Sequence, residues 1–209
     1  MGNTATGRRN SILAKQESSS SDGKVAKPSR QNTLIEEETT DDASGAIPEP
    51  SPLTEGQKQI LNDTWKVLEE DIAKVGVITF ISLFETHPDV QQVFLPFSGI
   101  ELEDLKHSKQ LRAHALRVMA FVQKAVARLE EPEKLEALLR ELGKKHYSYG
   151  AKAKYIDLIG PQFIQAIKPS LEEKWSDEVH DAWASLFFYM GCIMKQSMAT
   201  EEALKLKAQ

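Results

Sequence analysis

Two histidines on apolar helical faces constrain this chain more than any other feature. His114 follows Leu111 by three residues and precedes Val118 by four, and His146 follows Leu142 by four. Spacings of three and four residues place such side chains on one face of a helix. An imidazole on an apolar face costs free energy unless another group satisfies its nitrogens. Each histidine therefore needs a hydrogen-bond partner or a ligand inside the folded core.

The two histidine-bearing stretches also indicate how both rings could be satisfied together. Taken singly, each histidine is better explained as a hydrogen-bonded core residue than as a ligand. Taken as a pair, the two explanations are evenly matched, because two such faces would enclose an apolar slot with a nitrogen on each wall. That slot suits a haem iron held between helices by axial histidine. The remaining histidines are expected at helix ends or on the surface: His87, His107 and His180.

Length and composition fit a soluble domain preceded by a tail. The chain has 209 residues, of which 41% are hydrophobic, and its apolar runs fall short of the roughly 20 residues that cross a bilayer. The N-terminal residues lack the hydrophobic core of a secretory signal peptide, so secretion is not expected. The single cysteine, Cys192, excludes an internal disulfide framework and fits a reducing compartment. The net charge of −5 argues against nucleic-acid binding.

The first 52 residues differ in composition from the rest of the chain. They contain no aromatic residue, include the run Ser18–Ser21 and end in a proline-rich stretch at 48–52. Such a segment cannot bury enough apolar area to offset the entropy lost on ordering. The composition predicts a disordered arm over residues 1–52 and a folded domain over 53–209.

The arm carries a pattern for lipid attachment. Met1 to Thr6 fits M-G-x-x-x-[ST], in which Gly2 accepts a myristoyl chain. One such chain binds membranes weakly, and the six basic residues within 1–30 would add attraction to anionic lipid. Ser11 follows Arg8-Arg9-Asn10 as a candidate phosphorylation site that would weaken this attraction. We expect a lipid-anchored protein on the cytoplasmic face of the plasma membrane, cytosolic when not acylated; a solvated linker is the alternative.

Beyond residue 52 the apolar spacing is helical throughout, and no hairpin pattern indicates a sheet. Thr54 and Gln57 form a capping box, Pro132 opens a helix, and Ser176 caps the last one. No Cys-x-x-Cys motif or glycine-rich phosphate loop is present. We expect an all-α domain with a loop at 94–103, a kink at Gly160-Pro161 and helices over about 54–69, 71–85, 105–129, 132–149, 152–167 and 177–198.

Several residues of 53–199, in their order along the chain, resemble landmarks of the globin family, in particular its globin X and neuroglobin-like branch. The landmarks are Trp65, Pro88 followed by Phe94 and Phe97, His114-Ala-Leu-Arg-Val-Met119, Leu142-Gly-Lys-Lys-His146 and Trp183. The resemblance implies a globin fold of about seven to eight helices around a haem pocket, preceded by the disordered arm.

The resemblance also assigns roles to individual residues. His146 matches the proximal ligand of haem iron, and His114 matches the distal histidine, which either ligates the iron or gates its ligand. Arg117 matches a basic position that reaches a haem propionate. The residues that would line the pocket are Phe80, Phe94, Phe97, Val118, Leu142, Ile156 and Phe187.

The function implied by this branch is that of a b-type haem globin that binds oxygen and other diatomic gases. With both histidines on the iron, redox sensing or electron transfer to an unknown partner is expected, with nitrite reduction as an enzymatic variant. Two alternatives stay open at this point. One is an oxygen carrier or store with open, pentacoordinate iron, and the other is a haem-free helical interaction module.

Overall fold

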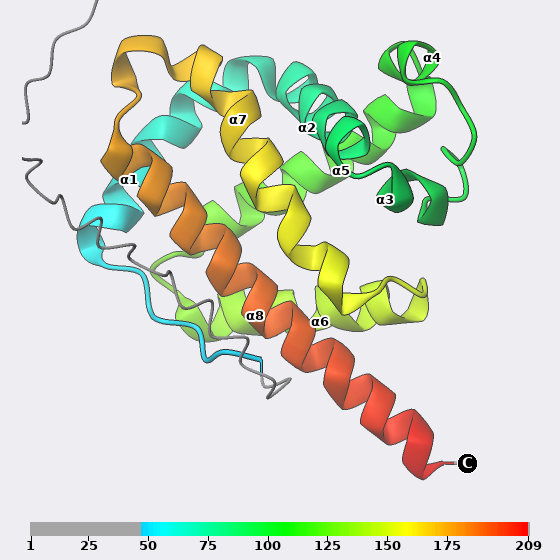
Figure 1. The fold of residues 1–209 in the computed structure, drawn as a ribbon. Coiled ribbons are helices and arrows are strands. Elements are labelled where there is room, and N and C mark those ends of the chain that lie inside the picture. The colour runs from blue at the N-terminus through cyan, green and yellow to red at the C-terminus, as the bar shows by residue number, and fades with distance from the viewer. Residues whose placement is uncertain (1–46, 209) are drawn as a thin grey trace, which may run out of the picture. The chain divides into compact units, whose positions relative to one another are not determined.

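The computed structural model describes residues 47–208, which are helical and contain no β-strand. The all-α prediction is confirmed. Ser44–Gln209 form one compact unit. Most of the predicted arm, including Gly2 and Ser11, lies outside the described residues. The α-helices, shown in Figure 1, are α1 (Glu55–Leu68), α2 (Ile72–Thr86), α3 (Pro88–Val93), α4 (Leu102–Lys106), α5 (Lys109–Val126), α6 (Pro132–Ser148), α7 (Ile159–Leu171) and α8 (Asp177–Lys207).

Side-chain caps begin three of these helices. The Thr54 hydroxyl accepts a hydrogen bond from the Gln57 amide at 3.2 Å, and the Gln57 side-chain oxygen accepts one from the Thr54 amide at 2.9 Å. This capping box satisfies backbone donors at the start of α1. Ser108 and Ser176 accept in the same way at the starts of α5 and α8. The predicted caps at Thr54 and Ser176 are therefore confirmed.

Three short 3-10 helices join the longer elements. They are η1 (Glu69–Asp71), η2 (Ala153–Leu158) and η3 (Glu172–Lys174). The expected helix over 152–167 is in fact η2 followed directly by α7. Pro161 lies in the first turn of α7, where a backbone N–H has no acceptor within the helix, so proline fits without bending it. The predicted kink at Gly160-Pro161 is wrong.

Three other boundaries differ from the prediction. The expected loop at 94–103 ends earlier, because α4 begins at Leu102. The long helix starts at Lys109 rather than near Leu105, because Ser108 caps it. The last helix continues beyond Met198 to Lys207. Its final turns run past the other helices, as Figure 1 shows, and Leu204 and Leu206 are exposed there. Within the described helices, none is long and apolar enough to cross a membrane.

The helices bury two hydrophobic clusters that meet at α5. Helix α2 packs against α5 and α7, while α8 packs against α1 and α6 (Figure 1). The large cluster joins side chains of α1, α5, α6, α7 and α8 around Trp65 and Trp183. The small cluster joins α2, α3, α4 and α5 around Phe84 and Leu111. Val118 on α5 packs against both clusters, so the boundary between them runs along the helix that carries His114.

Candidate functional site

His114 lies on α5 at the edge of the small cluster. Its helical neighbours Leu111 and Ala115 are fully buried, whereas His114 itself is half-buried. Gly76 of α2 allows this close packing, because a Cβ there would lie 3.0 Å from the Ala115 Cβ. The close approach of α2 to α5 therefore fixes the backbone beside His114.

An aromatic wall surrounds the His114 ring. The centroids of Phe80, Phe94 and Phe97 lie 4.9, 5.5 and 6.0 Å from the His114 centroid, each in edge-to-face orientation. Phe80 comes from α2, while Phe94 and Phe97 belong to the segment that follows α3. Edge-to-face contacts of this kind are favourable and exclude water from one side of the ring. The structure thus brings together four residues that the sequence had selected separately.

His146 lies in the last turn of α6. Its Nδ1 is 2.9 Å from the backbone oxygen of Leu142. A carbonyl oxygen only accepts, so Nδ1 must carry the proton and donate it. In a neutral ring the other nitrogen, Nε2, then carries no proton, and it makes no hydrogen bond within residues 47–208. A metal-binding histidine is commonly oriented by this same contact from its second nitrogen to a backbone carbonyl.

Burial keeps His114 neutral. The pKa of His114 is lowered from 6.5 to about 4, first by burial and then by the positive charge of Arg117, with a smaller electrostatic contribution from His146. The two histidines are carried by different helices, His114 by α5 and His146 by α6. At neutral pH, His114 therefore presents an uncharged imidazole that can ligate a metal or form a hydrogen bond.

The other predicted lining residues fall into two groups. Val118 and Leu142 are half-buried near the two histidines, at the edge of the large cluster. Ile156 and Phe187 pack against the same cluster but line a separate hollow of about 260 Å³ between η2, α7 and α8. Arg117 is exposed, and its Nη2 lies 3.5 Å from Nδ1 of His114. The structure groups Phe80, Phe94, Phe97 and Arg117 around His114, places Leu142 against His146, and leaves Ile156 and Phe187 in a separate hollow.

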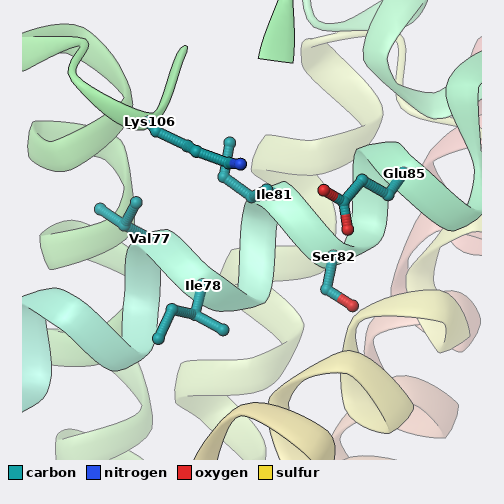
Figure 2. Close-up of a pocket in the computed structure, with 6 residues that line it drawn as sticks. All are labelled: Val77, Ile78, Ile81, Ser82, Glu85 and Lys106. Carbon is teal, nitrogen blue, oxygen red and sulfur yellow. The ribbon is translucent and has the colours of Figure 1, made fainter. Parts of the chain in front are cut away.

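A second hollow lies beside α2 and is unrelated to the histidines. Figure 2 shows its lining, and its volume is about 330 Å³. Glu85 and Lys106 give it a mixed charge, and it includes no residue of the predicted site. Among residues 47–208, no group of three or more His, Cys, Asp or Glu side chains could hold a metal ion. The candidate site is therefore the paired histidines and their aromatic wall.

Sequence reasoning missed residues that shape this site. Gln91 is buried, and its amide donates to the backbone oxygens of Phe97 at 2.9 Å and Ile100 at 2.8 Å. It thereby holds the segment that carries the aromatic wall. Phe84 contacts Phe80, Phe94 and Phe97 from behind the wall. The sequence does show a polar residue, Gln91, in the short helix after Pro88. Spacing along the chain could not identify the two backbone oxygens to which its amide donates.

Gly143 is a further residue of this kind. A Cβ at Gly143 would lie 2.5 Å from the Met194 backbone oxygen, so only glycine lets α6 lie this close to α8. The Ser197 hydroxyl, in the same contact, donates to the Arg140 backbone oxygen at 2.7 Å. The position of α6, and with it that of His146, therefore depends on having glycine, which has no side chain, at position 143.

Comparisons with known proteins agree on the family. A model of the Globin family matches residues 78–191. Cytoglobin-2 of Danio rerio is 30% identical over 154 residues, which cover 73% of this chain and 86% of the relative. Neuroglobin-1 of Oncorhynchus mykiss is 27% identical over 148 residues, covering 70% of this chain and 93% of the relative. A solved structure, described as a hexacoordinated heme protein from an anhydrobiotic tardigrade, has a TM-score of 0.67 at 19% identity and covers 71% of this chain and 96% of its own, a likeness that shows the fold.

Proposed function

Because this chain belongs to the globin family, we propose that it binds haem b between α5 and α6, with His146 as the proximal iron ligand and His114 on the distal side. The observation that carries the proposal is the contact from His146 Nδ1 to the Leu142 oxygen, at 2.9 Å. It fixes the tautomer in which Nε2 is free to bind iron and orients the ring from behind. Two imidazoles on different helices are a suitable donor set for an iron whose equatorial ligands come from a porphyrin.

Haem iron supplies reversible binding of diatomic gases and one-electron chemistry. The protein supplies the surroundings. Phe80, Phe94 and Phe97 exclude water around His114, and the lowered pKa of His114 keeps its ring uncharged at neutral pH. An uncharged imidazole can hydrogen-bond a polarised gas ligand or occupy the sixth iron position itself.

We propose that His114 occupies the sixth position in the resting protein, which suits redox sensing or electron transfer. The lowered pKa of His114, which keeps its ring uncharged, and its half-buried place against the aromatic wall support this assignment. The visible spectrum of the reduced protein under inert gas tests it. Two sharp, split bands are expected, whereas one broad band would indicate open iron and the oxygen-carrier alternative.

The haem site itself is tested by His146→Ala. This change removes the only atom assigned to hold the iron on the proximal side, so stable haem uptake should be lost. The readout is haem absorbance after reconstitution and gel filtration, and His180→Ala is the matched control, because His180 is exposed. Full haem retention by His146→Ala would overturn the assignment. Absence of haem from the unmodified protein would leave the interaction module.

We further propose that the protein is tethered to membranes through a myristoyl chain on Gly2. The proposal rests on the Met1–Thr6 pattern and on the net charge of +4 over residues 1–30, from six basic and two acidic side chains. A fixed location suits electron exchange with a membrane partner better than it suits bulk oxygen storage.

A further inference from the structure

Helix α8 presents an exposed aromatic side chain next to an apolar hollow. Phe188 is 49% exposed and lines the hollow of about 260 Å³ between η2, α7 and α8. The other apolar side chains that line it include Ile156, Ile164, Ala184 and Phe187. A large exposed apolar side chain beside such a hollow is typical of a surface that another molecule covers. An exposed ring and a hollow on one face can also fill each other when two copies of that face meet.

The packing of the backbone builds this hollow. A Cβ at Gly160 would lie 2.9 Å from the Phe187 Cβ, so α7 starts very close to α8. A Cβ at Gly191 would lie 2.8 Å from Oδ1 of Asp157, so this carboxylate rests against the α8 backbone. The other oxygen of Asp157, Oδ2, accepts a hydrogen bond from Nζ of Lys195 at 2.6 Å. These contacts fix the walls of the hollow and hold one acidic and one basic group beside it.

Charged residues lie at equal spacings along α8 on the two sides of Phe188. Asp181 precedes Phe188 by seven residues, and Lys195 follows it by seven. Seven residues are close to two helical turns, so the three side chains lie along one stripe of α8. If two α8 helices lie antiparallel about a twofold axis at Phe188, Asp181 of each copy faces Lys195 of the other. His180, at the other end of the hollow, then approaches the second copy's Asp157.

We propose that this α8 face, which comprises Asp181, Phe188, Lys195 and the adjoining hollow, binds a second copy of the chain in an antiparallel, twofold-symmetric dimer. The Phe188 ring of each copy covers the hollow of the other, and the Asp181–Lys195 pairs flank the two rings. A twofold interface uses the same surface on both copies, so its opposite charges must lie at equal distances from the axis. The seven-residue spacings on α8 meet this requirement. The inference goes beyond the proposed function and depends on neither haem nor Gly2.

The contacts within one copy leave both charged groups able to pair across the interface. Within residues 47–208, Lys195 forms an ion pair with Asp157 alone, and an ammonium group has three N–H donors. Asp181 is exposed and contacts only the exposed His180 in the same part of the chain. The second copy would also cover the outer side of Ile156 and Phe187, which the family resemblance assigns to the haem pocket.

Sedimentation velocity on full-length, non-acylated protein tests the proposal. Between about 1 and 200 µM, a range suited to an interface of modest affinity, the unmodified protein should form a dimer. Phe188→Asp should raise the dissociation constant about 30-fold or more, because it places a charge at the apolar centre of the interface. Leu116→Asp is the matched control, since Leu116 is an exposed apolar residue of α5 and its variant should leave the dissociation constant unchanged. Far-UV circular dichroism checks that each variant is folded.

A charge exchange tests the antiparallel arrangement separately. Asp181→Lys should weaken self-association, because like charges then face each other on both sides of the axis, and Lys195→Glu should do the same. A mixture of these two variants should form a heterodimer, since each then meets opposite charge at both ends. Native mass spectrometry distinguishes the heterodimer from the two homodimers.

Three results would overturn the proposal. They are a monomeric protein across the whole concentration range, a dimer that Phe188→Asp leaves intact, and a charge-variant mixture that forms no preferred heterodimer. None of them bears on haem uptake or on acylation, so the proposed function is tested independently of this dimer.

Discussion

The imidazole of His114 is held neutral mainly by burial and by the charge of Arg117, which lower its pKa from 6.5 to about 4. Between these two pH values the unfolded chain binds more protons than the folded one, so acid favours unfolding. In haem-free protein, the free energy of unfolding should therefore fall as the pH drops from about 6.5 toward 4. Urea titrations across this range should show a flatter pH dependence for His114→Leu, and identical slopes for the two proteins would contradict the assigned burial.

The side chain of Gln91 stabilises the segment after α3, because its amide donates to two backbone oxygens there. Gln91→Leu would remove the side-chain donor from the Ile100 oxygen and would leave the Phe97 oxygen with only the long bond, 3.3 Å, from the Ile100 amide. The free energy of unfolding should drop by about 1–3 kcal/mol, the cost of buried polar groups that lose their partners. The neighbouring Gln92 is exposed and accepts one exposed hydrogen bond, from the Ser98 hydroxyl, which water can replace, so Gln92→Leu should stay within about 0.5 kcal/mol in the same urea titration. Equal effects of the two changes would show that the segment after α3 does not depend on Gln91.

Among the elements, the packing of α6 on α8 decides where His146 lies. Gly143→Ala would place a Cβ 2.5 Å from the Met194 oxygen and force the two helices apart. The free energy of unfolding should fall by about 1–3 kcal/mol, and haem affinity should fall with it because His146 is one turn away. Gly56→Ala in α1 is the matched control, since its nearest neighbour is 4.0 Å away. That change should raise stability by about 0.4–1 kcal/mol. Thermal unfolding measures the stability of both variants, and haem titration measures their haem affinity. Unchanged stability in Gly143→Ala would contradict the close packing of α6 against α8.

For the whole molecule, the proposed tether joins a helical domain to a basic arm within a chain of net charge −5. Protein produced with an N-myristoyltransferase should bind vesicles that contain anionic lipid, and Gly2→Ala should abolish acylation and most of this binding. Gly7→Ala is the matched control, and Ser11→Asp should weaken binding without preventing acylation. Sedimentation with vesicles gives the bound fraction. Equal binding by Gly2→Ala and the unmodified protein would exclude the tether.

Spacings of three and four residues along the chain were enough to predict the helical class, the caps at Thr54 and Ser176, and the placing of His114 and His146 on apolar faces. The sequence also selected Phe80, Phe94 and Phe97, through their order and the family resemblance. The functional roles of these residues stay predictions until haem binding is measured.

The distances between helices could not be predicted in this way, because they depend on how the helices pack against one another. Spacing along one chain carries no information about the Gly143 approach to α8, the two backbone oxygens that Gln91 serves, or the electrostatic effect of His146 on His114. Local spacing also placed a kink at Gly160-Pro161, where a new helix begins instead. A helix start depends on which neighbouring groups can satisfy its free N–H donors, and a distance between helices depends on the side chains of both, so each of these features emerges only when the whole core is packed.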